Sequence, residues 1–304
     1  MTRVSKLDSG LTIVSAEMPY SASVSIGVFV KVGSRDESGS QYGASHFLEH
    51  LIFKGTESLS ARDLAVVVDS FGGEMNAFTT KETTSFQLRL LDEAVEIGID
   101  ILGQILTAPA LRPLDIDSER SVILEEIAMA SDEPADLVQE MLASVIYNGH
   151  PLGREVLGSR ESIISMDRAT IDKFFTAYYG PPNMVVAAAG HVNHDLLIEK
   201  FQAMFTSLQA VSTRKDIYER SKFGDRHHFA AIVHTYFSFR RIQNLKDSSP
   251  GLLHSSGIFG SNSDQTYRPV IINRDFGSSL LLHRVYVLTL WSYDLPNFVK
   301  GYFN

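Results

Sequence analysis

Two histidines and a glutamate lie close together in the segment GASHFLEHLIFKGT, residues 43–56. If this segment is helical, His46 and His50 lie one turn apart on the same side, so both imidazoles could bind a single metal ion. Glu49 flanks the same face, where a carboxylate could take a proton from a metal-bound water. The three side chains therefore have the types and the spacing of a metal site with its own general base.

The spacing alone leaves two interpretations open. H-x-x-E-H is the inverse of the H-E-x-x-H motif of zinc peptidases. A catalytic zinc site needs a third protein ligand, and because the chain has no cysteine, we expect a carboxylate or another histidine. The alternative is an amphipathic helix whose histidines lie at the surface or at the edge of the core.

A candidate for the third ligand lies in the segment SERSVILEEIAM, residues 118–129. Glu119 and Glu126 are seven residues apart and share one face of a predicted helix. Val122 and Ile123 lie on the same side, so we expect this face to be buried. A buried carboxylate needs a cationic partner, and a metal ion would supply one for Glu126. The alternative is an acidic helix surface in contact with water.

Composition narrows the class of protein. The 304 residues have a mean hydropathy near zero, enough for one large domain or two smaller ones. The absence of cysteine excludes disulfides, thiolate metal sites and cysteine nucleophiles. A net charge of −9 argues against a nucleic-acid-binding protein. The first twenty residues contain no long apolar run, so we expect no secretory signal, no membrane span and a cytoplasmic location.

The charge is distributed unevenly along the chain. Residues 1–210 contain 15 basic and 29 acidic side chains, whereas residues 211–304 contain 12 and 7. The C-terminal part also holds five of the ten histidines and the single tryptophan. We therefore predict a domain boundary near residue 210, with an atypical or truncated second half at 211–304 that we could not assemble into a compact domain.

The elements that must position these residues follow from periodicity. Alternation of apolar residues at period two predicts strands at 22–32 and 83–91. Further strands are predicted at 11–17 and 74–80, and a continuous apolar run predicts a buried strand at 183–192. Helical spacing and caps predict helices at 46–53, 60–71, 92–106, 115–130, 134–147, 160–166, 169–179 and 194–206. Strands in runs followed by helices in runs predict an α+β fold, with a mostly antiparallel sheet and helices packed on one face.

The segment SRDESGSQYGASHFLEHLIFKGT resembles the active-site segment of pitrilysin/insulinase-type metallopeptidases. It is most similar to the branch that contains the mitochondrial processing peptidase and small bacterial relatives. In that family a glutamate ligand follows the motif at about the distance found here, where Glu126 lies 76 positions after His50. FGGEMNAFTTKETTSF, HPLGREVLGSRESI and YYGPPNMVVAAAGHV are similar to further landmarks of the family. The likeness extends in register from about residue 3 to residue 208.

The resemblance implies a role for each residue of the constellation. His46, His50 and Glu126 would bind one zinc ion, and Glu49 would activate a zinc-bound water as general base. Glu119 would orient His50 or relay protons. The implied activity is that of a zinc-dependent endopeptidase acting on unfolded peptides or presequence-like segments.

The resemblance also assigns a substrate strand. Asn76, Ala77 and Phe78 match the strand on which the family holds an extended peptide through main-chain hydrogen bonds at the sheet edge. From the residues alone, Asn76 is equally consistent with a turn after the pair of glycines at 72–73.

The chain departs from the family in its C-terminal part. Catalytic members usually carry a second, related half of similar size, which contributes an Arg/Tyr pair that holds the substrate backbone. Arg284 and Tyr286 resemble this pair only weakly, and their spacing does not match. Two alternatives therefore remain: a non-catalytic or degenerate subunit of a processing-peptidase-like complex, or a peptide-binding protein that uses its sheet edge without chemistry. A homodimer or a partner subunit is also expected, because the zinc half alone would expose its facing surface.

Overall fold

One six-stranded sheet forms the centre of the part of the chain described by this computed structural model, residues 2–208. The strands lie in the spatial order β1-β2-β6-β3-β5-β4. Strand pairs are antiparallel except β2 with β6, which is parallel. The bounds are β1 (Thr2–Lys6), β2 (Thr12–Glu17), β3 (Ser23–Val30), β4 (Glu74–Thr79), β5 (Thr84–Leu91) and β6 (Met184–Gly190).

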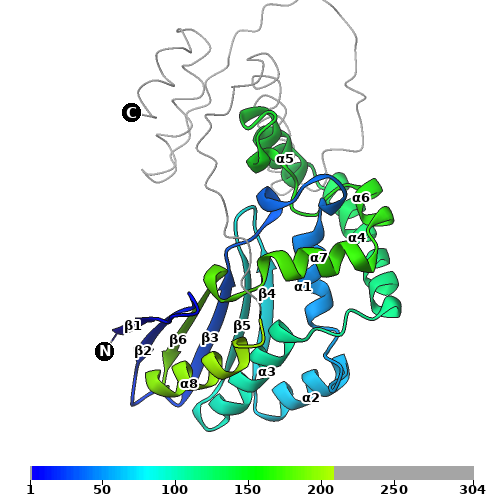
Figure 1. Cartoon of the computed structure of the whole chain (residues 1–304). Coiled ribbons are helices and arrows are strands. Elements are labelled where there is room, and N and C mark those ends of the chain that lie inside the picture. Colours follow the sequence, from blue (N-terminus) through cyan, green and yellow to red (C-terminus); the bar gives the residue numbers. More distant parts are fainter. Residues whose placement is uncertain (1, 209–304) are drawn as a thin grey trace, which may run out of the picture. The chain divides into compact units, whose positions relative to one another are not determined.

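Helices cover one face of this sheet (Figure 1). The helices of the described residues are α1 (Ala44–Ile52), α2 (Ala61–Ser70), α3 (Val95–Thr107), α4 (Pro113–Asp132), α5 (Pro134–Ile146), α6 (Arg160–Ser165), α7 (Arg168–Tyr178) and α8 (His194–Phe205). Short 3₁₀ turns lie at Ser34–Asp36, Gly39–Gln41, Asp92–Ala94, Pro151–Gly153 and Pro181–Asn183. Among the described residues, no helix is both long enough and apolar enough to cross a membrane.

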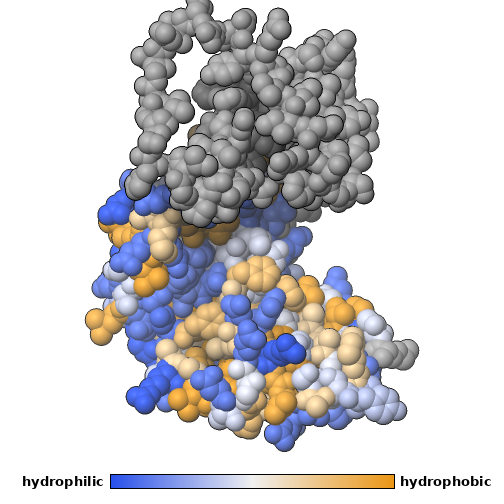
Figure 2. All heavy atoms as spheres, turned by 180° about the vertical axis from the view of Figure 1, so that it is seen from behind, coloured by the Kyte–Doolittle hydropathy of each residue, from blue (hydrophilic) through white to orange (hydrophobic). Residues whose placement is uncertain are grey.

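The two faces of the sheet differ in burial. On β3, Val24, Ile26 and Val28 are buried and point toward the helices, as expected for alternating apolar residues. The opposite face is shown in Figure 2, where apolar side chains lie among polar ones. Phe78 and Val185 are partly exposed on it. The predicted fold class, a mostly antiparallel sheet with helices on one face, is confirmed.

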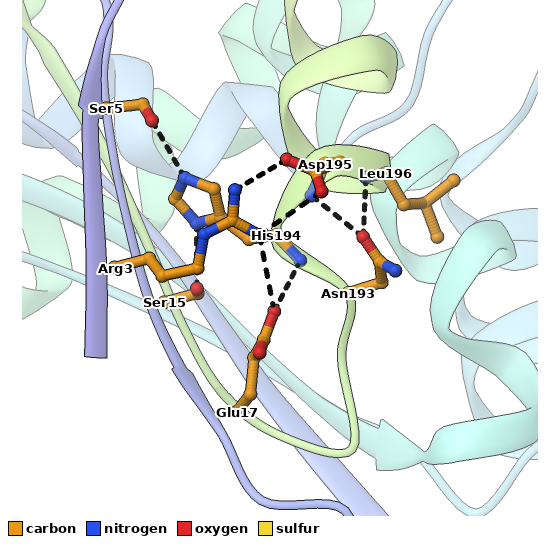
Figure 3. A network of polar contacts seen from close by, with 8 residues as sticks. All are labelled: Arg3, Ser5, Ser15, Glu17, Asn193, His194, Asp195 and Leu196. Atoms are coloured by element: carbon orange, nitrogen blue, oxygen red, sulfur yellow. Dashed lines mark hydrogen bonds and ion pairs between the residues drawn. The ribbon is translucent and has the colours of Figure 1, made fainter. Parts of the chain in front are cut away.

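Strand β1 was not predicted from the sequence, because Val4 is its one apolar residue and each of its side chains is at least partly exposed. Polar contacts attach it to α8 instead (Figure 3). The buried ring of His194 lies between two hydroxyls, with Nε2 2.9 Å from Ser5 Oγ and Nδ1 2.8 Å from Ser15 Oγ. Arg3 forms an ion pair with Asp195. The first strand is therefore fixed by hydrogen bonds rather than by an apolar face.

The other predicted elements agree with the structure to within a few residues at their ends. Ser60 caps α2 as expected, since its hydroxyl accepts from the Asp63 amide and the Asp63 carboxylate accepts from the Ser60 amide. The predicted boundary near residue 210, and the residues Arg284 and Tyr286, lie outside the described residues.

Candidate metal centre

Helix α1 presents its two histidines away from the core. Phe47, Leu48 and Leu51 fill the apolar face of this helix and are almost completely buried. Burial of that face fixes the rotation of the helix, which leaves His46 and His50 on the side facing α4. Their side chains are 13% and 18% exposed, so solvent can still reach the site.

Glu126 of α4 joins the two histidines. His46 Nε2 lies 3.3 Å from His50 Nε2, and each of these nitrogens lies 3.6 Å from Glu126 Oε2. Zinc bound tetrahedrally at about 2.0–2.1 Å requires ligand atoms about 3.3–3.4 Å apart. One separation equals this value and the other two exceed it by about 0.2–0.3 Å, so the three side chains could hold one zinc ion after small adjustments.

The charge state of His46 also fits a metal site. Burial, reinforced by the neighbouring His50, lowers the pKa of His46 to about 4. The imidazole is therefore neutral at physiological pH, which is the form that donates a lone pair to a metal. Two imidazoles and one carboxylate are ligands that suit zinc.

Glu119 lies behind His50 and does not belong to the ligand triangle. Its Oε2 is 3.0 Å from His50 Nδ1, and its Oε1 is 2.7 Å from the Lys54 ammonium. Burial opposes ionisation of this carboxyl, but the hydrogen bonds from Lys54 and His50 outweigh it, so the pKa of Glu119 lies below its ordinary value. An ionised Glu119 can accept the Nδ1 proton of His50, which leaves Nε2 free for a metal.

The side chain of Glu49 is held by a residue of the sheet. The Thr79 hydroxyl, at the end of β4, donates a 2.5 Å hydrogen bond to Glu49 Oε2. Burial raises the pKa of Glu49, whereas Thr79 and His50 lower it and Glu126 raises it further. The carboxyl is therefore a stronger proton acceptor than an exposed glutamate, as a general base requires.

The predicted substrate strand lies next to this site, at the edge of the sheet. β4 pairs only with β5 among the described strands. Because Thr79 reaches Glu49, alternation along the strand places Asn76 and Phe78 on the opposite face. Asn76 Oδ1 accepts a 2.8 Å hydrogen bond from the Ala77 amide. The side chains of Asn76 and Phe78 thus do not share the face of the ligand triangle.

A pocket of about 250 Å³ lies beside the ligand helix, between α4, α5 and residues 155–157. Its apolar lining includes Ile127 and Leu157, and its acidic lining comprises Asp136, Glu140 and Glu155. Burial, followed by the nearby charge of Glu140, raises the pKa of Glu155. The pocket therefore combines apolar walls with carboxylates, which suits a long side chain that ends in a positive charge.

Sequence reasoning missed several residues around the site. Lys54, Thr79 and Glu37 were not singled out, although all three lie within the motif segments quoted for the resemblance. The contacts of Lys54 and Thr79 join segments distant in the sequence, and Glu37 reaches the start of α1 from a preceding irregular segment, so no periodic pattern identifies these residues.

Comparison with known proteins identifies the family. A profile described as Insulinase (Peptidase family M16) matches residues 12–160, and one described as Peptidase M16 inactive domain matches residues 165–249. An uncharacterized zinc protease of Rickettsia bellii is 32% identical over 308 residues, which cover 99% of this chain and 71% of that protein. The chain belongs to peptidase family M16, the insulinase family. The family predicted from the sequence is thereby confirmed, and its processing-peptidase branch stays a prediction.

Other relatives in family M16 are longer than this chain. An uncharacterized zinc protease of Streptomyces coelicolor is 41% identical over 203 residues, covering 67% of this chain and 44% of that protein. An uncharacterized zinc protease of Mycobacterium leprae is 41% identical over 201 residues, which cover 66% of this chain and 45% of that protein. The chain thus spans less than half the length of these two relatives.

Solved structures agree with this family. A protease from Helicobacter pylori has 27% sequence identity and a TM-score of 0.66, and the match covers 71% of this chain and 52% of that one. Pitrilysin has 22% identity and a TM-score of 0.65 over 73% of this chain and 24% of its own. The likeness to pitrilysin shows the fold alone.

Proposed function

We propose that this protein is a zinc-dependent endopeptidase that hydrolyses unfolded peptides. The observation that carries the proposal is the triangle of His46, His50 and Glu126, whose edges of 3.3 and 3.6 Å are close to those that one tetrahedral zinc ion needs. Glu49 lies on the same helix as the two histidines. Membership of family M16 and the names of the relatives support a zinc peptidase. The role of each residue is part of the proposal.

Each residue has a defined task in this mechanism. Bound zinc would act as a Lewis acid on the scissile carbonyl. Glu49, kept basic by burial and oriented by Thr79, accepts a proton from the attacking water and delivers it to the leaving nitrogen. Glu119 fixes the ring of His50 through Nδ1.

The edge strand supports an extended, unfolded substrate. Thr80 donates to the carbonyl of Thr83 and closes the β4–β5 hairpin. Because hydrogen-bonded positions alternate in antiparallel pairs, the main chain of Ala77 and Thr79 faces outward from the sheet. A peptide that adds itself as a further strand would bond to these groups and displace Asn76 Oδ1 from the Ala77 amide.

The acidic pocket supports a preference for basic segments of the presequence type. Asp136, Glu140 and Glu155 would attract a lysine or arginine side chain, while Ile127 and Leu157 contact its aliphatic stem. Lys81 already binds Glu140 at 3.0 Å, so Asp136 and Glu155 supply most of the negative charge.

The variant Glu49→Gln tests the mechanism. It should keep about one zinc per chain and lose about 10²- to 10⁴-fold in kcat on a quenched unfolded peptide. Asp69→Asn, a similar loss of one charge on the exposed side of α2, serves as control and should cleave at the parental rate. Equal cleavage by Glu49→Gln and the parent would remove Glu49 as the base.

A second function, peptide binding without cleavage, is supported by the edge strand. β4 pairs only with β5 among the described strands, so its outer edge could take up an extended peptide through main-chain hydrogen bonds without any chemistry. Peptide binding without cleavage in a zinc-loaded, purified chain would support this alternative.

A further inference from the structure

Helix α1, which carries the two candidate ligand histidines, begins without a capping side chain of its own. Its N-cap is Gly43, with φ at +89°. A Cβ atom at this position would lie 2.7 Å from Ile163 Cδ1 and 2.8 Å from the Leu157 carbonyl oxygen. The usual capping residues therefore do not fit, and the first amides of the helix need a partner from elsewhere.

Glu37 supplies that partner from six residues upstream. Its Oε2 accepts a 2.8 Å hydrogen bond from the Gly43 amide, and its Oε1 accepts one of 2.8 Å from the Ser45 amide. The residue is only 2% exposed. Its negative charge lies at the positive end of the helix dipole, where a carboxylate is favoured. Both oxygens are thus used to hold the first turn of α1.

The segment that carries Glu37 is itself fixed. The guanidinium of Arg154 donates to the Glu37 carbonyl oxygen and lies over the ring of Tyr42, 4.9 Å from its centre. The Tyr178 hydroxyl donates a 3.0 Å hydrogen bond to the Asp36 carbonyl. The carboxylate therefore approaches α1 from a rigid support, and the position of the helix start depends on it.

The two histidines differ in how their rings are held. His50 Nδ1 is bonded to Glu119, whereas the buried Nδ1 of His46 has no hydrogen-bond partner among residues 2–208. Ligand histidines are normally oriented through their second ring nitrogen. The orientation of His46 therefore depends on the backbone that carries it, and Ser45, whose amide Glu37 binds, is the preceding residue.

We propose that Glu37 is a positioning residue for the metal centre, which holds the first turn of α1 so that His46 already lies in its ligand position when a metal ion arrives. The inference rests on the proposed zinc site, since it assigns Glu37 a part in forming that site. Burial raises the pKa of Glu37 to about 7, so its ionised form is unfavourable for folding at neutral pH. Tighter metal binding would offset that cost.

The test measures zinc affinity of the full chain by competition with a chelator, together with the visible spectrum of the Co²⁺-substituted protein. Glu37→Gln keeps the shape but places an amide N–H₂ against one of the two main-chain donors. Its zinc affinity should fall 10- to 100-fold, as for other residues that orient ligands, and its Co²⁺ bands should shift. Glu37→Asp withdraws the carboxylate by one methylene and should give an intermediate loss.

The control is Asp63→Asn, which removes a carboxylate that caps α2 by accepting from Ser60 at 3.0 Å. It should lower Tm and leave zinc affinity and the Co²⁺ bands unchanged. Parental zinc affinity in both Glu37 variants, or an equal loss in the control, would overturn the proposal. Absence of zinc binding by the parent would instead refute the proposed function itself, so the two failures are distinguishable.

Discussion

The carboxylate behind His50 offers a graded test of the metal centre. Glu119 accepts from His50 Nδ1 at 3.0 Å and from the Lys54 ammonium at 2.7 Å. In Glu119→Gln the amide oxygen can still accept the His50 proton, while the charge and the hydrogen bond from Lys54 are lost. Glu119→Ala removes the hydrogen bond from His50 as well. We expect zinc affinity to fall about 10-fold in the first variant and about 100-fold in the second, or about 1.4 and 2.7 kcal/mol.

The contribution of Lys54 to this effect should be small. Its side chain is 35% exposed, so in either variant the ammonium can turn to water at a cost of at most about 1 kcal/mol in folding free energy. Chelator competition with zinc measures the affinity, and thermal unfolding measures the cost to folding. Glu125→Gln, the same change on the same helix at an exposed position, is the control. Parental zinc affinity in Glu119→Ala would refute the reasoning.

Two further predictions concern other carboxyls. Burial raises the pKa of Glu37 from 4.5 to about 7, so its contribution to the free energy of unfolding is full below pH 4.5 and is lost as the pH rises through 7. With zinc chelated, the parent should therefore lose about 3 kcal/mol relative to Glu37→Gln between pH 4 and 8 in urea titrations, and a constant difference would contradict this. Glu155→Gln should lower kcat/KM about tenfold for a peptide with an arginine near the cleaved bond and leave a neutral analogue unchanged; equal effects on both peptides would exclude the pocket as a basic subsite.

The sequence predicts much of this site because its main residues lie on regular helices. His46, Glu49 and His50 follow from helical spacing, and so do Glu119 and Glu126, two turns apart. The approach of the two helices does not follow from spacing, since 76 residues separate His50 from Glu126. Only the resemblance to family M16 joined them before the structure placed them together.

The contacts that side chains of loops and strand ends make could not be predicted from the sequence. Glu37 was not singled out from the sequence, yet both of its oxygens bind the start of α1. Val122 was expected on the buried face of α4 but is 40% exposed, while its neighbour Ile123 is fully buried. The buried face of α4 is thus narrower than the pattern indicated. Strand β1 escaped prediction because polar groups fix it.

Zinc content measured on the purified full chain tests the central claim most directly. Elemental analysis after dialysis against trace zinc should give about one zinc per chain for the parent. His46→Ala and Glu126→Gln should each hold well under one zinc, whereas Glu49→Gln and Glu125→Gln should match the parent. Stoichiometric zinc in both ligand variants would contradict the assignment of His46, His50 and Glu126 as the metal centre.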